Sequence, residues 1–219
     1  MFSKVKRIFL CTTLLGLPAL YAQSATDTVA VLQHDWARVN YELQGEQQKA
    51  AYEALIERAD AAVAENHGSA PILIWNGIIK SSYAGIKGGL GALSLAKKAR
   101  KSLRAAMAID DTALDGSAYT SLGTLYYRVP GWPLGFGSDK KAVKLLEKAL
   151  EINPEGIDSN YFYADYLIHN KEFNKAQKYL LRAQQAAPRV SRPVADAGRQ
   201  KEILAALSGL RGKLKNQGS

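Results

Sequence analysis

The chain has 219 residues, a formal net charge of +9 at pH 7 and a single cysteine, Cys11. One cysteine excludes an intramolecular disulfide and a zinc site built from several thiolates, so the fold must be stabilised by packing. The three histidines, His34, His67 and His169, are far apart in the sequence and match no metal or catalytic motif. We therefore expect no enzymatic activity, no metal and no cofactor.

The first predicted element is an export signal. Lys4, Lys6 and Arg7 precede an apolar stretch from Ile8 to Leu20, and the small residue Ala22 follows it. This is the layout of a secretory signal peptide. The stretch is shorter than the roughly 20 residues that a helix needs to cross a bilayer. We expect cleavage after Ala22, a periplasmic protein and no transmembrane span afterwards, with an uncleaved anchor as the alternative.

The positive charge is moderate once that signal has been removed. Because no acidic residue precedes residue 23, the loss of its three basic residues leaves a formal charge of +6. The densest basic group consists of Lys97, Lys98, Arg100, Lys101 and Arg104. It is either a solvated helix face or a contact for an anionic surface or ligand. An exported protein is not expected to have a nucleic-acid partner.

The next elements are predicted to be two helical hairpins. Apolar residues from Val29 to Leu43 recur at helical spacing, and 46–65 is rich in helix formers. The second hairpin, 72–111, is a degenerate repeat with Trp75 in its first helix and Ile79 where the two helices cross. Its connection is predicted as a nine-residue loop, Gly85 to Leu93, whose glycines supply positive φ angles.

A repeat of 34 residues is the strongest signal in the second half of the chain. Ala142, Leu146, Ala149 and Pro154 recur as Ala176, Leu180, Ala183 and Pro188. The period and the series Tyr119, Leu122, Gly123, Tyr126 follow the tetratricopeptide-repeat pattern, in which small residues allow two helices to cross closely. The sequence predicts repeats at 116–154 and 157–190.

The loop from Val129 to Asp139 is longer than such a repeat requires. It combines prolines with Trp132 and Phe136. These aromatic side chains either fold back onto the hairpin or line a pocket.

The last element is an amphipathic helix after Pro193, with Ile203, Leu204, Leu207, Leu210 and Leu214 on one face. A solenoid needs such a helix to cover its exposed end. The sequence therefore predicts an all-α protein: a signal peptide at 1–22 and one domain at 23–219, built from four helical hairpins and a C-terminal capping helix.

The first helix of each repeat is expected to face a concave groove. Its lining, with the two loop aromatics, would mix aromatic faces with single polar groups, as a site for an organic anion or a peptide requires. The expected binding residues are Asn76, Lys80, Tyr83, Thr120, Thr124, Tyr127, Arg128, Trp132, Phe136, Tyr161, Asp165 and His169.

Three segments resemble a known group of proteins: GGLGALSLAKKA, LDGSAYTSLGTLYYRVPGWPLGFG and ALEINPEGIDSNYFYADYL. They look like exported bacterial tetratricopeptide-repeat proteins, which are similar to the periplasmic T components of TRAP transporters. The resemblance implies a periplasmic helical-repeat fold, oligomerisation, a hydrophobic cleft and a solute-binding protein as partner. It also implies small, often organic-acid, ligands.

Two functions remain open at this stage. The first is a non-enzymatic periplasmic binding or adaptor protein, accessory to TRAP-type transport, with a groove for a small apolar or organic-acid ligand. The second is a protein-interaction scaffold in cell-envelope assembly. A closed apolar cavity would favour the first function, and an open polar groove would favour the second.

Overall fold

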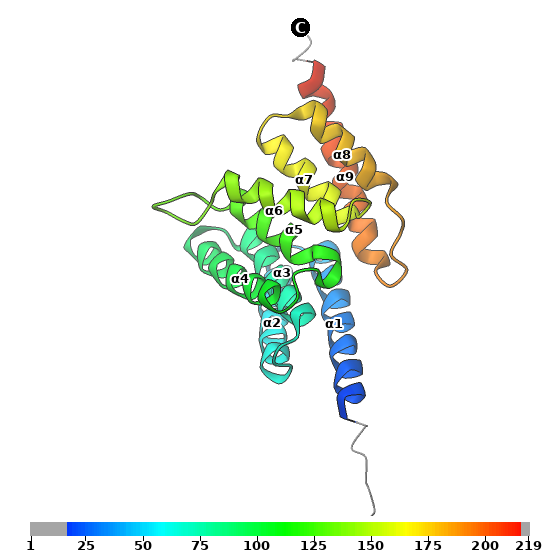
Figure 1. Cartoon of the computed structure of the whole chain (residues 1–219). Helices are drawn as coiled ribbons and strands as arrows, with labels where there is room; N and C mark the ends of the chain where they lie inside the picture. The colour runs from blue at the N-terminus through cyan, green and yellow to red at the C-terminus, as the bar shows by residue number, and fades with distance from the viewer. Residues whose placement is uncertain (1–16, 216–219) are drawn as a thin grey trace, which may run out of the picture.

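The computed structural model describes residues 17–215, and the side chains of 25–214 within them. This part of the chain consists of helices and their connections, without strands (Figure 1). The helices are α1 (Leu17–Tyr41), α2 (Gly45–Glu65), α3 (Ala70–Lys87), α4 (Gly89–Ile109), α5 (Ala113–Arg128), α6 (Asp139–Ile152), α7 (Ile157–His169), α8 (Phe173–Gln185) and α9 (Pro193–Lys215). The predicted all-α, tetratricopeptide-like hairpin fold is confirmed. The export signal lies mostly outside the described residues, and its cleavage stays a prediction.

The hairpins are held by close crossings at glycine. A Cβ on Gly123 of α5 would lie 2.8 Å from Cγ of Leu146 in α6, so only hydrogen fits there. In the preceding hairpin the same relationship joins Gly77 of α3 to Leu103 of α4, at 2.6 Å. The prediction that Ile79 marks this crossing was therefore wrong by two residues, because Gly77 makes the close approach.

The predicted loop from Gly85 to Leu93 was also wrong. α3 continues to Lys87 and α4 begins at Gly89, so a single residue, Gly88, interrupts the helices. Gly88 and Gly89 have φ angles of 68° and 61°, which permit the reversal. The extra residues of this hairpin lengthen its helices to 18 and 21 residues, against 13 each for α7 and α8.

The core consists of two apolar clusters that meet in α3. One runs from α3 through α8 into α9 and includes Leu103, Leu146 and Leu180. The other joins α1, α2 and α3 and includes Leu55 of α2 and Ala195 of α9. α9 therefore contributes to the cores at both ends of the stack.

α9 does more than cover the last hairpin. It packs along α8 but also contacts α1, and Gly198 of α9 lies against the ring of Tyr41. The Tyr41 hydroxyl donates a hydrogen bond to Glu202, with 3.4 Å between the oxygen atoms. The C-terminal helix thus connects the last hairpin to the first. Figure 1 shows it alongside α8.

Candidate functional site

The concave side contains a cavity of about 710 Å³. Its walls come from α1, α3, α4, α5, α7 and α9 and from the α5–α6 and α8–α9 connections. A volume in this range accommodates a drug-sized organic molecule.

Three first helices present equivalent positions to the cavity. The crossing residue is Gly77 in α3 and Gly123 in α5, and Ala164 takes this place in α7. The residue two positions before the crossing lines the cavity in each helix: Trp75, Ser121 and Phe162. The same position of three successive first helices therefore contributes to the cavity wall. The side chain at this position differs in chemistry from one repeat to the next.

Two tryptophans make up much of the apolar wall. Trp36 of α1 and Trp75 of α3 meet edge to face, with ring centroids 5.6 Å apart. The indole Nε1 of Trp36 donates to Oγ of Ser82 at 2.9 Å. The other apolar groups lining the cavity include Ile78, Leu90, Leu93, Leu125, Val129, Pro130, Leu134 and Phe162.

One end of the cavity is charged. Asp158, at the start of α7, accepts hydrogen bonds from Arg189 at 2.6 Å and from Arg199 at 2.9 Å. Arg189 also pairs with Asp196, and Arg199 with Glu202. Arg189 and Arg199 thus form ion pairs with Asp158, Asp196 and Glu202. These contacts connect α9 and the segment before it to α7.

These contacts shift the ionisation of the network. Burial by itself raises the pKa of Asp158, but Arg199, Arg189 and Arg192 more than offset it and hold the pKa well below the usual range. Burial raises the pKa of Glu202, and the Arg199 charge only partly opposes this. Of Asp158 and Glu202, Asp158 is therefore the carboxylate that the arginines hold in its charged form.

Arg192 is the exception within this network. It lines the cavity, yet its side chain has no hydrogen-bond or ion-pair partner among the described residues, and its Nε is a buried donor without an acceptor. The guanidinium carbon lies 5.0 Å from the centre of the Trp75 ring. The indole Nε1 of Trp75 is likewise buried without an acceptor. Burial, reinforced by the charge of Arg189, lowers the pKa of Arg192.

Such unpaired donors have a chemical consequence. A buried N–H group without an acceptor carries a desolvation cost, and a guanidinium forms its strongest hydrogen bonds with a carboxylate or phosphate. The guanidinium of Arg192 therefore makes this part of an apolar cavity suited to an anion.

Only three of the twelve residues expected to bind a ligand line this cavity: Thr120, Thr124 and Arg128. Thr120 is buried and Thr124 half-buried, and the Thr124 hydroxyl donates to the Thr120 carbonyl. Arg128 pairs with Asp165.

The expected residues of α3 face another helix instead. Lys80 and Asn76 hydrogen bond to Asp60 of α2, at 2.5 Å and 2.7 Å. Tyr83 donates to Glu53 of α2 at 2.6 Å. The two-residue error in the crossing position placed these side chains on the wrong face, and they lie at the junction between the first two hairpins.

The expected residues of α7 also take structural roles. Asp165 accepts hydrogen bonds from Tyr127 and Arg128, which joins α5 to α7. Tyr161 packs under the Arg199 guanidinium, 4.4 Å from the ring centre, and burial raises its pKa to about 12. His169 is exposed beside the ring of Tyr127.

The two aromatic side chains of the α5–α6 loop behave differently, and only Phe136 follows one of the two expected arrangements. Phe136 folds back, edge to face with Tyr126 and 4.1 Å below the Arg100 guanidinium. Trp132 does neither, because it is 90% exposed and lines no part of the cavity.

Both segments that depart from a plain repeat contribute to the cavity. The α5–α6 loop contributes Val129, Pro130 and Leu134, and the residues on either side of the α3–α4 turn contribute Gly85, Gly89 and Leu93. The two unusual segments therefore border the same site.

Three of the four charged residues that line the cavity were not predicted from the sequence: Asp158, Arg192 and Arg199. They lie outside the aligned repeat positions, and the two arginines reach the cavity because α9 returns to α1. The sequence offered one signal, the cluster of arginines flanking Pro193.

Among the residues that the structure describes, no group of three or more His, Cys, Asp or Glu side chains is placed to hold a metal ion. Within 17–215, every helix is too short or too polar to cross a membrane.

A protein-family model matches part of the second half of the chain. Residues 140–198, from α6 to the start of α9, match the family model described as tetratricopeptide repeat. No curated protein matches the chain in a sequence search. Repeats of this type generally serve as scaffolds whose concave surface binds partners.

Two crystal structures of MamA are similar to this chain. One is 16% identical, with a TM-score of 0.44, over 88% of this chain and 95% of the other. The second is 17% identical, with a TM-score of 0.45, over 79% and 94%. Both are too distant to bear on the function.

Proposed function

We propose that this protein is a non-enzymatic binding protein that holds a small, mainly apolar organic anion in the cavity enclosed by α9. The observation that carries the proposal is Arg192, which lines an apolar cavity of about 710 Å³ and whose guanidinium forms no ion pair or side-chain hydrogen bond within the described residues. The apolar wall supplies affinity, and the guanidinium selects a carboxylate or a similar head group.

The cellular setting is part of the same proposal. The N-terminal sequence is typical of a secretory signal, so the binding protein acts in the periplasm. There it receives its ligand from, or passes it to, another envelope protein. An accessory role in TRAP-type transport, with a solute-binding protein as partner, is the specific form that the resemblance of the three segments supports.

Two cavity tryptophans make the proposal testable in solution. The chain has three tryptophans, of which Trp36 and Trp75 line the cavity. In a Trp132→Phe background, fluorescence therefore reports on the cavity alone. Titration with decanoate and with 1-decanol, which share a tail and differ in the head group, should perturb this signal. Decanoate is expected to bind about tenfold more tightly, since a hydrogen bond to a charged group contributes roughly 1.5 kcal/mol.

The variant Arg192→Gln tests whether the Arg192 guanidinium binds the carboxylate of the ligand. It should abolish the preference for the acid and leave the affinity for decanol unchanged. Arg182→Gln is the matched control, because Arg182 is exposed on α8 and lies outside the cavity. If neither compound changes the fluorescence of Trp36 and Trp75 at any concentration below its solubility limit, the proposal is wrong.

A scaffold that grips an extended peptide is the second candidate function. The tetratricopeptide repeats of 140–198 favour it. Against it, the expected polar groove residues Asn76, Lys80 and Tyr83 are buried between hairpins, where a peptide cannot reach them.

A further inference from the structure

Three of the four most exposed large apolar side chains of the described chain belong to the start of α4 and the α5–α6 loop. Leu90 and Trp132 are each 90% exposed, and Leu134 is 73% exposed. Leu90 begins α4 and Leu134 belongs to the α5–α6 loop, and both also line the cavity. The mouth of the cavity is therefore bordered by apolar groups that face solvent, with Trp132 beside them at the end of the loop.

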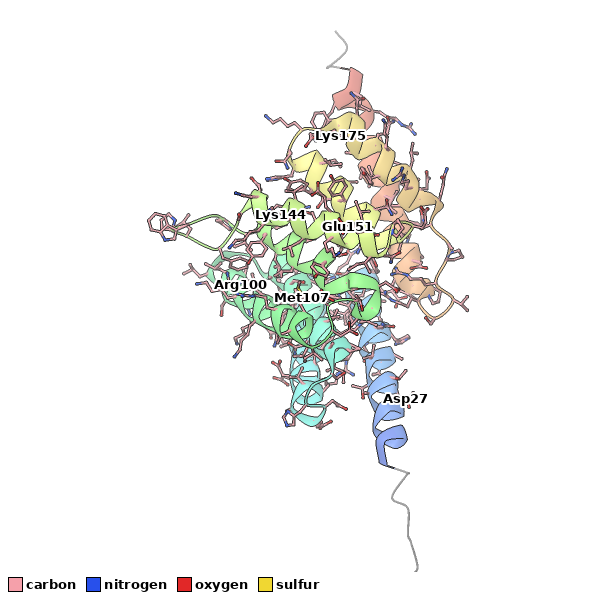
Figure 2. All side chains as sticks on the ribbon, viewed as in Figure 1. Asp27, Arg100, Met107, Lys144, Glu151 and Lys175 are labelled. Carbon is pink, nitrogen blue, oxygen red and sulfur yellow. The ribbon has the colours of Figure 1, made fainter. Side chains whose placement is uncertain are left out.

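This loop projects from the body of the protein. It extends away from the helices on the side where α4 begins (Figure 1). Its base is fixed to α4, because the Arg100 guanidinium lies 4.1 Å from the centre of the Phe136 ring. Figure 2 shows Arg100 on α4 near the base of the loop. The base of the loop is thus held by a defined contact, and the exposed tip extends beyond it.

The apolar tip continues into a row of positive charge. At helical spacing, Lys97, Lys101 and Arg104 follow Leu90 along one face of α4, and all three are exposed. α4 contains five basic and no acidic residues. None of these five residues forms an ion pair within the described chain. Beyond the loop, the first turn of α6 adds the exposed residues Lys140 and Lys141 next to Asp139.

We propose that this surface, formed by Leu90, Trp132, Leu134 and the basic face of α4, docks the protein on an anionic lipid bilayer. Apolar side chains at the end of a projecting loop enter the interface, where tryptophan is favoured. Unpaired lysine and arginine side chains are attracted to negatively charged head groups. Docking in this way turns the mouth of the cavity towards the lipid, so an amphipathic ligand can pass between the two without crossing water.

Trp132 provides a direct test with the full chain. Trp36 and Trp75 are buried, and residues 1–22 contain no tryptophan, so a change on adding vesicles reports on Trp132. Vesicles of phosphatidylcholine with phosphatidylglycerol should shift its emission to the blue and allow quenching by brominated lipid. Phosphatidylcholine alone should have little effect, and Trp132→Phe should abolish the signal.

Variants separate the apolar tip from the charge. In a vesicle co-sedimentation assay, Trp132→Ser should weaken binding roughly tenfold. Val190→Ser should not, although Val190 is 96% exposed in the α8–α9 connection. Each of Lys97→Gln and Lys101→Gln should weaken binding about fivefold. Lys178→Gln and Lys201→Gln, exposed lysines of α8 and α9, are the matched controls with the same change in net charge.

Three results would overturn the proposal. The first is an unchanged Trp132 emission with anionic vesicles. The second is equal binding to neutral and anionic vesicles, and the third is an equal loss in the α4 variants and their lysine controls. A shift produced by polyglutamate but not by vesicles would assign the surface to an acidic protein instead. Because these readouts require no cavity ligand, they are independent of the decanoate titration.

Discussion

A Cβ built on Gly198 of α9 would lie 2.4 Å from ring atoms of Tyr41 at the end of α1. No side chain fits in that space, so the closure of the last helix onto the first depends on a glycine in the middle of a helix. The Tyr41 hydroxyl then reaches Glu202, one turn further along α9. This contact encloses the concave side and brings Arg192 and Arg199 to the cavity.

Gly198→Ala should therefore destabilise the protein, although alanine is the better helix former. Overpacking of this kind costs about 1–3 kcal/mol. Gly209→Ala in the same helix is the control, since a Cβ there meets nothing within 4 Å. It should raise the free energy of unfolding by about 0.5–1 kcal/mol. Urea denaturation of the two variants measures both effects, and two changes of the same sign would contradict the packing described.

The hairpin crossings make a second prediction. Gly77→Ala and Gly123→Ala force a methyl group against Leu103 and Leu146, and each should lower the free energy of unfolding by about 1–3 kcal/mol. Gly85→Ala, also within α3 but with open space around its Cβ, should be neutral or stabilising. Thermal unfolding followed by circular dichroism distinguishes them. A Gly77→Ala variant as stable as the wild type would contradict the assignment of the α3–α4 crossing to Gly77.

The third prediction concerns pH. The pKa of Asp158 in the folded protein lies well below its ordinary value of 3.8, so its contribution is present above that value and is lost as the pH falls below it. Asp158→Asn should lower the free energy of unfolding at pH 7 by roughly 1–3 kcal/mol. The difference from the wild type should stay constant above about pH 5 and shrink towards pH 3.

Denaturation curves at several pH values provide that comparison. Glu155→Gln is the control, because Glu155 is exposed and no ion pair engages it. A difference between Asp158→Asn and the wild type that persists undiminished at low pH would mean that the arginine contacts do not hold the carboxylate in its charged form.

Tyr127 tests the assignment of the polar residues between hairpins. Its hydroxyl donates to Asp165, and burial, followed by the charge of Asp165, raises its pKa well above the usual range. Tyr127→Phe should lower the free energy of unfolding by about 0.5–1.5 kcal/mol and leave ligand affinity unchanged. Calorimetric titration with decanoate measures the ligand affinity. A marked loss of affinity would show that Tyr127 contributes to ligand binding.

The helices could be predicted from the sequence because their signals are local. The 34-residue period, the small residue Gly123 and the prolines after each second helix specify the last two hairpins. The position of α9 could not be predicted in this way. A helical face such as Ile203, Leu207 and Leu210 shows that the helix packs on something, but its return to α1 depends on the superhelical path of all four hairpins.

The site was only partly predictable for the same reason. Thr120, Thr124 and Arg128 were identified because the register of α5 is fixed by Gly123. Asn76 and Lys80 were misplaced because Ile79 was taken as the crossing in α3, and an error of two residues turns a helix by more than half a turn. Arg192 lies between repeats, where the period carries no information.

Native mass spectrometry of the protein purified from cells without denaturation is the decisive test for a ligand in the cavity. We expect one small anionic molecule per chain, retained by the wild type and by Arg182→Gln and lost from Arg192→Gln. A bare chain from all three, or a chain recovered only with a second protein, would contradict a ligand cavity and favour a scaffold.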